Sequence, residues 1–175
     1  MCFFVAQVGD NTSRVIGVDM TYEMLDVART NAPIVAERVG YSNVEFRKGR
    51  IQDLALDLEK LDKELKARPI TDVASFLRAD ELAQELRVKH PLVASASVDV
   101  VVSNCVLNLV EAKAKRQLFE EIFRVLKIGG RAVISDIVSD EESPEHLQTD
   151  PDTWRGCIPG APTADGFLPA LREAG

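Results

Sequence analysis

The segment Ser97-Val-Asp-Val-Val-Val-Ser-Asn-Cys105 is the most informative part of this sequence. Its run of valines predicts a buried strand, as in a parallel sheet. A cysteine at the point where such a strand opens into a loop is accessible and firmly held, and α/β proteins commonly bind substrates at that edge of the sheet. Cys105 is therefore the first candidate for chemistry. The alternative is a small buried side chain, since free cysteines are among the most buried residue types.

Strand and helix patterns precede this segment. Residues 14–19 predict a short strand that ends in an acid, and Thr21 is expected to cap a helix. Pro33 should end or kink that helix near Ala32, because proline cannot donate a helical hydrogen bond. A second short strand is predicted at residues 44–46.

The rest of the chain continues the alternation. Charged, helix-favouring residues from about 51 to 92 predict a helical insertion, and residues 111–126 predict an amphipathic helix. A further strand is expected at residues 131–136, and a last helix begins at Phe167. Alternating strands and helices predict an α/β fold with a doubly wound, mostly parallel sheet.

Composition narrows the class of protein. The 175 residues carry a net charge of −7 and are 46% apolar, which indicates a single soluble globular domain. The acidic balance, without a basic cluster, argues against nucleic-acid binding, and no apolar run approaches the roughly 20 residues of a membrane span. Three widely spaced cysteines do not form a secreted disulfide framework, so a reducing cytoplasm is the expected location.

Asp19 stands where a nucleotide-binding sheet often carries an acid. In a doubly wound sheet, a carboxylate at the end of the second strand accepts both ribose hydroxyls of an adenosine-containing cofactor. A glycine-rich loop should lie about 20 residues earlier, and residue 19 leaves no room for it. The alternative is an ordinary surface acid in a turn.

Several segments together resemble the arsenite methyltransferases, which use S-adenosylmethionine. The common class I methyltransferase segment is Phe123-Arg-Val-Leu-Lys-Ile-Gly-Gly130, whereas the specific ones are Asp99-Val-Val-Val-Ser-Asn-Cys-Val-Leu-Asn-Leu109 and Cys157-Ile-Pro-Gly-Ala161. Two weaker matches are Gly17-Val-Asp-Met-Thr21 and Asn43-Val-Glu-Phe-Arg-Lys-Gly49. The resemblance implies a class I methyltransferase, Rossmann-like fold.

The resemblance also implies the substrate ligands. Cys105 and Cys157 would be the two thiolates that bind trivalent arsenic, a soft centre that thiolates suit. Cys2 would be a third ligand or a redox partner during turnover. The substrate would be arsenite, possibly as a thiol conjugate, with a thiol reductant as a second small-molecule partner.

For S-adenosylmethionine, the resemblance implies a set of contacts on both sides of the insertion. Asp19 would hold the ribose, Met20 would lie beside the adenine, and Asn104 would lie near the methionine end. Gly49, Arg50 and Ile51 would border the adenine ring. As alternatives, Met20 and Ile51 could be core residues, and Asn104 could cap the strand end.

The resemblance places Cys2 at the start of the helix that follows the family's glycine loop. The chain is therefore expected to be a partial methyltransferase domain, 1–175, without the first strand and glycine loop, and to bind cofactor poorly. Residues 137–175 would begin the substrate-binding C-terminal region.

Two other functions stay open at this point. A methyltransferase of a small organic acceptor would explain the strand order but not the cysteines. A non-enzymatic thiol module that captures arsenite would need no cofactor.

Overall fold

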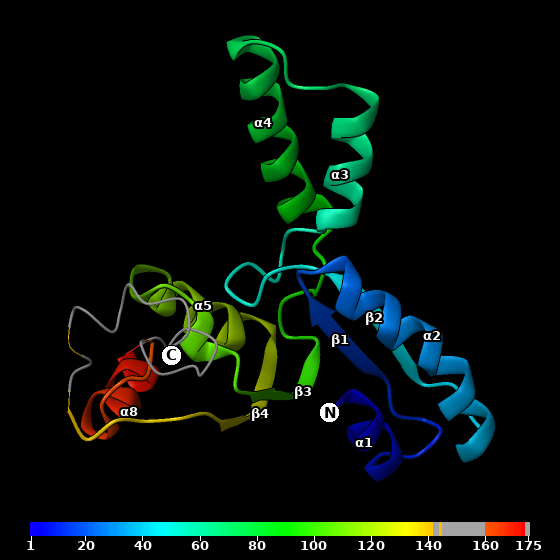
Figure 1. Ribbon diagram of the computed structural model, residues 1–175, viewed down its shortest axis with the longest axis vertical. Helices are drawn as coiled ribbons and strands as arrows, with labels where there is room; N and C mark the ends of the chain where they lie inside the picture. Colours follow the sequence, from blue (N-terminus) through cyan, green and yellow to red (C-terminus); the bar gives the residue numbers. More distant parts are fainter. Residues whose placement is uncertain (142–143, 145–159, 174–175) are drawn as a thin grey trace. The chain divides into compact units, whose positions relative to one another are not determined.

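The computed structural model describes residues 1–141, 144 and 160–173. The chain divides into two compact units, Met1–Leu92 and Val93–Gly175 (Figure 1). Among the described residues, no helix has the length and apolar character needed to cross a membrane. The prediction of a single domain stays a prediction.

The first unit is built on a parallel strand–helix–strand motif. Strand β1 (Val15–Asp19) pairs in parallel with β2 (Val44–Lys48), and helix α2 (Tyr22–Val39) connects them. Helix α1 (Cys2–Val8) packs on β1, and Phe3 meets Phe46 edge to face with ring centroids 5.5 Å apart. Both predicted strands are thus confirmed, and their carboxyl ends lie side by side.

Helix α2 is longer than predicted. It continues through Pro33 to Val39, so the expectation that it ends near Ala32 is wrong. Proline removes one hydrogen bond from the helix, but the turns on either side are fixed independently. Before Pro33, Arg29 donates to Glu59 and to the Phe46 carbonyl, and after it Gly40 ends the helix in the left-handed conformation at φ 85°.

The predicted helical insertion is present as two helices that lie side by side, α3 (Leu58–Ala67) and α4 (Val73–Lys89) (Figure 1). Asp57 caps α3 by accepting from two backbone N–H groups, and Asp72 caps α4 in a capping box with Ser75. Their core contains Leu56, Ala83 and Leu86, with Leu58, Leu61 and Leu82 packed against it.

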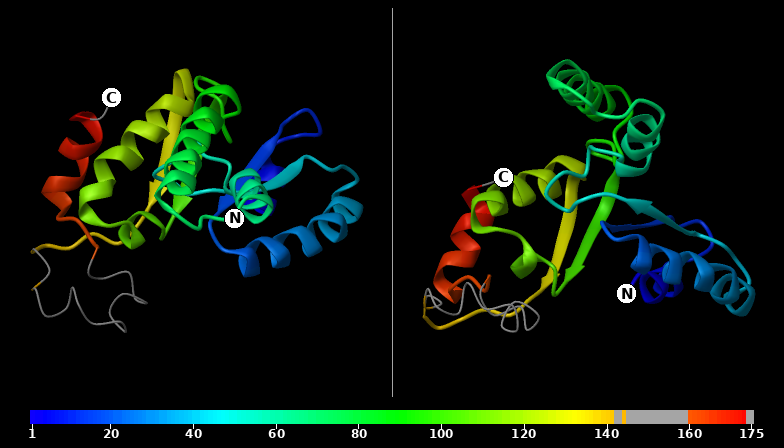
Figure 2. Two further views of the ribbon diagram at one scale, coloured as in Figure 1. Left: turned by 90° about the horizontal axis from the view of Figure 1, so that it is seen from above. Right: turned by 45° about the horizontal axis from the view of Figure 1, so that its top comes forward.

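The second unit pairs β3 (Val98–Asn104) in parallel with β4 (Leu126–Ser135). Helix α5 (Ala112–Val125) connects them after a 3-10 turn, η1 (Leu107–Leu109), and α8 (Ala164–Glu173) contacts α5 (Figure 2). The apolar face predicted for α5 is confirmed, since Leu118, Ile122 and Val125 are at most 1% exposed.

Three details of the second unit differ from prediction. The strand predicted at 131–136 is longer, because residues 126–130 also belong to β4, where Gly129 adopts φ 81°. Helix α8 begins at Ala164, three residues before Phe167. Strand β3 is buried on one face only, since Ser103 is buried while Val100 and Val102 are 52% and 39% exposed.

Candidate cofactor and thiol sites

Asp19 ends β1 and is partly exposed. Its Oδ1 accepts hydrogen bonds from the Thr21 N–H at 2.8 Å and the Thr21 hydroxyl at 2.9 Å. Its own carbonyl oxygen accepts from the Gly49 N–H at 3.0 Å, which ties the ends of β1 and β2 together. The carboxylate is therefore oriented by its own turn, and no described residue is shown to donate to Oδ2.

Gly49 is buried directly after β2, and a larger residue there would have to displace neighbouring side chains. A Cβ atom would collide with the Leu92 side chain and would lie 3.2 Å from Val18. The next two residues, Arg50 and Ile51, are exposed and half-buried, and Arg50 forms an isolated bridge with Asp53. Gly49 thus begins a tight loop beside the Asp19 turn.

The five residues predicted for the nucleoside half of a cofactor lie at the carboxyl ends of two paired strands. The register pairs Asp19 with Lys48, so the Asp19–Met20 turn and the Gly49–Ile51 loop are neighbours. Met20 is 57% exposed and is therefore not a core residue. A partly exposed, oriented carboxylate beside the exposed Met20 suits a ribose and the ring attached to it, so this strand edge fits an adenosyl group.

Cys105 follows the last residue of β3 and is exposed. Its backbone adopts φ 55°, in the left-handed region that residues with a Cβ rarely occupy. Its N–H donates to the Ser135 carbonyl at 2.9 Å, and Asn104 pairs with Ser135 in the strand ladder. The thiol-bearing residue is thus at the carboxyl edge of the sheet, as predicted, and Asn104 is exposed beside it.

The loop after Cys105 is fixed to the end of the neighbouring strand. The Leu107 N–H donates to Asp136 Oδ2 at 2.9 Å, and Asn108 Nδ2 donates to the Ile137 carbonyl at 2.8 Å. Asn108 is 1% exposed, and its Oδ1 has no hydrogen-bond partner among the described residues. These bonds show that the loops after β3 and β4 leave the same edge of the sheet.

A third segment reaches this edge at Gly160. A Cβ atom on Gly160 would overlap the Asn108 carbonyl, and Lys115 Nζ donates to the Gly160 carbonyl oxygen. Burial lowers the pKa of Lys115, an effect that nearby Asp136 opposes. Cys157 itself lies outside the described residues, but Gly160 follows it by three positions in the sequence.

Cys2 begins α1 in the first unit and is half-buried. A Cβ on Gly17 would lie 3.0 Å from its Sγ, so the thiol packs closely on β1. Burial raises the pKa of this thiol. Among the described residues, no group of three or more His, Cys, Asp or Glu side chains could hold a metal ion.

Thr21 is the N-cap residue of α2, as predicted, but its side chain makes no capping hydrogen bond and donates to Asp19 instead. Sequence patterns assigned no orienting role to Asn108, Lys115, Asp136 or Gly160. Asp136 had a usable signal, because it ends a predicted strand just as Asp19 does. Of the two histidines, His90 is exposed and His146 lies outside the described residues, as does Trp154.

The two parallel strand–helix–strand motifs define an α/β protein. A family model described as "Methyltransferase domain" matches residues 1–175, and the chain belongs to this methyltransferase family. The fold is accordingly the predicted class I, Rossmann-like type.

Named relatives are similar over nearly the whole chain. An "Arsenite methyltransferase" of Halobacterium salinarum is 38% identical over 174 residues, 99% of this chain and 34% of that protein. One of Aquipseudomonas alcaligenes is 34% identical over 174 residues, 99% of this chain and 40% of that protein. This chain therefore spans well under half the length of these relatives.

A solved structure is similar as well. The crystal structure of an arsenic(III) S-adenosylmethionine methyltransferase from Chlamydomonas reinhardtii matches with a TM-score of 0.69 and 28% identity. The match covers 98% of this chain and 46% of that protein.

Proposed function

We propose that this chain is the part of an arsenite methyltransferase that binds S-adenosylmethionine and trivalent arsenic. Two thiolates, Cys105 and Cys157, would hold arsenite, and Cys2 would serve as a third ligand or as a redox partner. A reducing compartment such as the cytoplasm, with a thiol reductant, suits thiolates that must stay reduced.

The observation that carries this proposal is the contact between Gly160 and Asn108. Asn108 is three residues after Cys105, and Gly160 is three residues after Cys157. Three residues span at most about 11 Å, so this contact limits how far apart the two cysteines can be. Trivalent arsenic needs soft ligands within a few ångströms of one another, and under this proposal Cys157 would be the second such ligand beside the exposed Cys105.

The cofactor residues of the first unit support the same proposal. Asp19 would accept the ribose hydroxyls through the oxygen that Thr21 leaves available, with Met20 beside the adenine. Gly49, Arg50 and Ile51 would border the ring, and Asn104 would contact the methionine end. When bound, S-adenosylmethionine supplies an electrophilic methyl group.

The proposed reaction requires the protein to position the two reactants, and it requires no proton transfer. Arsenic in arsenite carries a lone pair, so it is a nucleophile without losing a proton, and no general base is needed. The thiolates would orient that lone pair toward the methyl group, and correct alignment can supply a large part of the rate.

One titration tests the proposal. Equilibrium binding of arsenite and of S-adenosylmethionine is measured on the same sample, with Cys105→Ser and Asp19→Ala as variants. The expected result is binding of both ligands, with the cofactor bound only weakly, as predicted from the sequence. Arsenite binding should be lost only in Cys105→Ser, and cofactor binding should be weakened further only in Asp19→Ala. Cofactor binding alone would indicate an organic acceptor, and arsenite binding alone would indicate a capture module without methyl transfer.

A further inference from the structure

The loop between β2 and α3 depends on one carboxylate. Asp53 Oδ1 accepts from the Leu56 N–H at 3.2 Å, and the Asp53 N–H donates to the Arg50 carbonyl at 3.0 Å. The Asp53 side chain is only 15% exposed. Asp53 therefore closes the turn that presents Arg50 and Ile51.

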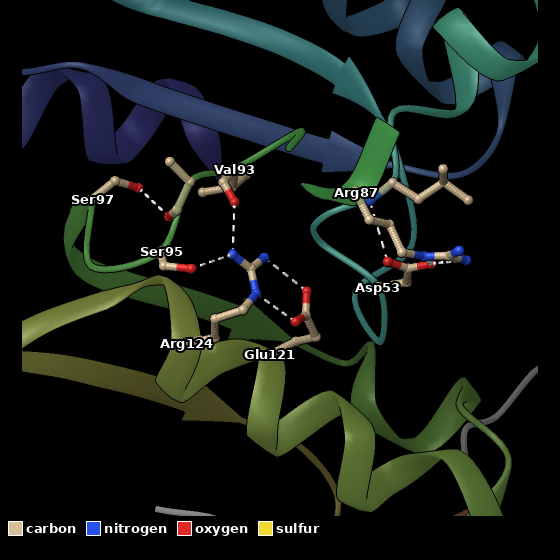
Figure 3. A network of polar contacts seen from close by, with 9 residues as sticks. Asp53, Arg87, Val93, Ser95, Ser97, Glu121 and Arg124 are labelled. Carbon is tan, nitrogen blue, oxygen red and sulfur yellow. Dashed lines mark hydrogen bonds and ion pairs between the residues drawn. The ribbon is translucent and has the colours of Figure 1, made fainter. Parts of the chain in front are cut away.

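The other oxygen of this carboxylate is held by the helical insertion. Arg87, on α4, donates to Asp53 Oδ2 from Nε at 3.0 Å and from Nη2 at 2.9 Å (Figure 3). The Arg87 side chain is 31% exposed, so water screens this pair less than an ion pair on the open surface. Together with the bond from the Leu56 N–H to Oδ1, this charged contact to Oδ2 fixes the direction of the carboxylate.

The arginine comes from a helix whose position is coupled to the same loop. Leu56 belongs to the loop and also to the buried cluster with Ala83 and Leu86 of α4. After α4 the chain returns to the loop, where the Leu92 N–H donates to the Ala55 carbonyl at 2.9 Å. Displacing α4 would therefore displace the loop.

A second connection joins the insertion to the Asp19 turn. Tyr22, the first residue of α2, donates its hydroxyl to Asp62 Oδ2 of α3 at 2.9 Å. Lys48 Nζ lies 3.2 Å from the centre of the Tyr22 ring. The insertion thus contacts both segments that carry the proposed nucleoside contacts.

We propose that the helical insertion positions the adenine-binding loop, with Asp53 and Arg87 as the positioning pair. The inference rests on the proposed function, because that function assigns the adenine to Gly49–Ile51. A binding group must be held within about 0.5 Å of its productive place, and an exposed loop reaches that precision only when neighbouring residues lock it.

The test measures amide hydrogen exchange across residues 49–56 in the full chain, together with the affinity for S-adenosylmethionine. Arg87→Met and Asp53→Asn should each raise exchange in this loop by roughly tenfold, because each removes charge-assisted bonds that close it. Arg87→Lys, which keeps the charge but loses the two-donor geometry, should show a smaller rise. The affinity for cofactor should fall by a similar factor in Arg87→Met, while arsenite capture stays unchanged.

Lys89→Met provides the matched control. Lys89 lies on the same helix and pairs with Glu85 at 2.7 Å, but both side chains are more than half exposed. This variant should leave loop exchange and cofactor affinity at wild-type values.

The outcomes separate the two proposals. Unchanged exchange at 49–56 in Arg87→Met, or an opened loop with undiminished cofactor affinity, would overturn the positioning role. Failure of the wild-type chain to bind S-adenosylmethionine at any concentration tested would instead overturn the proposed function. A general rise in exchange that includes α5 would show unfolding and would also count against a local positioning role.

Discussion

Gly160 packs so closely against Asn108 that no side chain can be accommodated between them. This contact lies where the loops after β3 and β4 are joined, beside the exposed Cys105. It connects the sheet edge to a segment far along the chain, and it makes the shape of that edge sensitive to a single methyl group.

Gly160→Ala should therefore displace this segment. The added methyl meets backbone atoms, which cannot rotate away, so we expect a loss of about 1–3 kcal/mol in the free energy of unfolding. Arsenite capture should weaken in parallel, and urea denaturation with arsenite titration measures both. Gly166→Ala is the control, since a methyl there meets only the Thr163 hydroxyl. Equal effects of the two substitutions would contradict the special role of Gly160.

Arg124 should be a major source of stability in the second unit. It binds Glu121 through two nitrogens and donates to the Val93 carbonyl at 3.0 Å and to Ser95 Oγ at 3.1 Å (Figure 3). Arg124→Met should lower the free energy of unfolding by about 1–3 kcal/mol, because these charge-assisted bonds fix the approach to β3.

Arg116→Met on the same helix is the comparison for Arg124. Arg116 also pairs with a glutamate, but its side chain is 83% exposed. We expect a change within about 0.5 kcal/mol in chemical denaturation. Similar losses in the two variants would show that the Arg124 contacts to the backbone contribute little.

Asp19→Ala should weaken S-adenosylmethionine binding by about 1–3 kcal/mol, the range for a lost hydrogen bond to a charged group. Equilibrium dialysis measures the affinity, and arsenite capture should be unchanged. Asp10→Ala is a closely matched control. Asp10 also accepts from the N–H and hydroxyl of a threonine two residues later, but it precedes β1. If both variants lose affinity equally, Asp19 acts through its turn and not through the cofactor.

The Cys2 thiol should resist alkylation at neutral pH. Burial raises its pKa, so the thiolate that reacts is scarcer in the folded chain than in the unfolded one. Iodoacetamide labelling followed by mass spectrometry should show Cys2 reacting more slowly in the native chain than in urea. Its rate should keep rising at pH values where the unfolded thiol has already levelled off.

The same shift has a consequence for stability. The folded state holds the Cys2 proton more tightly than the unfolded state does, so the protonated thiol adds to the free energy of unfolding. This contribution is complete below the pKa of the unfolded thiol. It is lost as pH rises from that value through the higher folded pKa. Cys2→Ser should reduce this alkaline loss, and an identical pH profile in that variant would contradict the assignment.

Local patterns predicted the elements of this chain well, because apolar periodicity records which face each element buries. Leu118 and Ile122 identified the inner face of α5, and capping residues such as Asp57 and Asp72 account for the helices of the insertion. The prediction that the helix ends near Pro33 was wrong because α2 is held by residues elsewhere in the chain, among them Glu59.

From the sequence, candidate site residues stand out only where a reactive or charged side chain lies at the end of a strand. Asp19 stands out because a carboxylate ends its strand, and Cys105 because a thiol follows directly after one. Arg87 and Lys115 could not be found in this way. Each acts through a partner more than 30 positions away, and only the fold shows that pairing.

The left-handed backbone of Cys105 places stability and function in opposition. At φ 55° any residue with a Cβ costs about 1–2 kcal/mol relative to glycine. Cys105→Gly should therefore give a more stable protein than the wild type, whereas Cys105→Ala keeps the unfavourable conformation. Selection for stability alone would favour glycine here. Under the proposed function, this cost would be the consequence of presenting a thiol to arsenite from this loop.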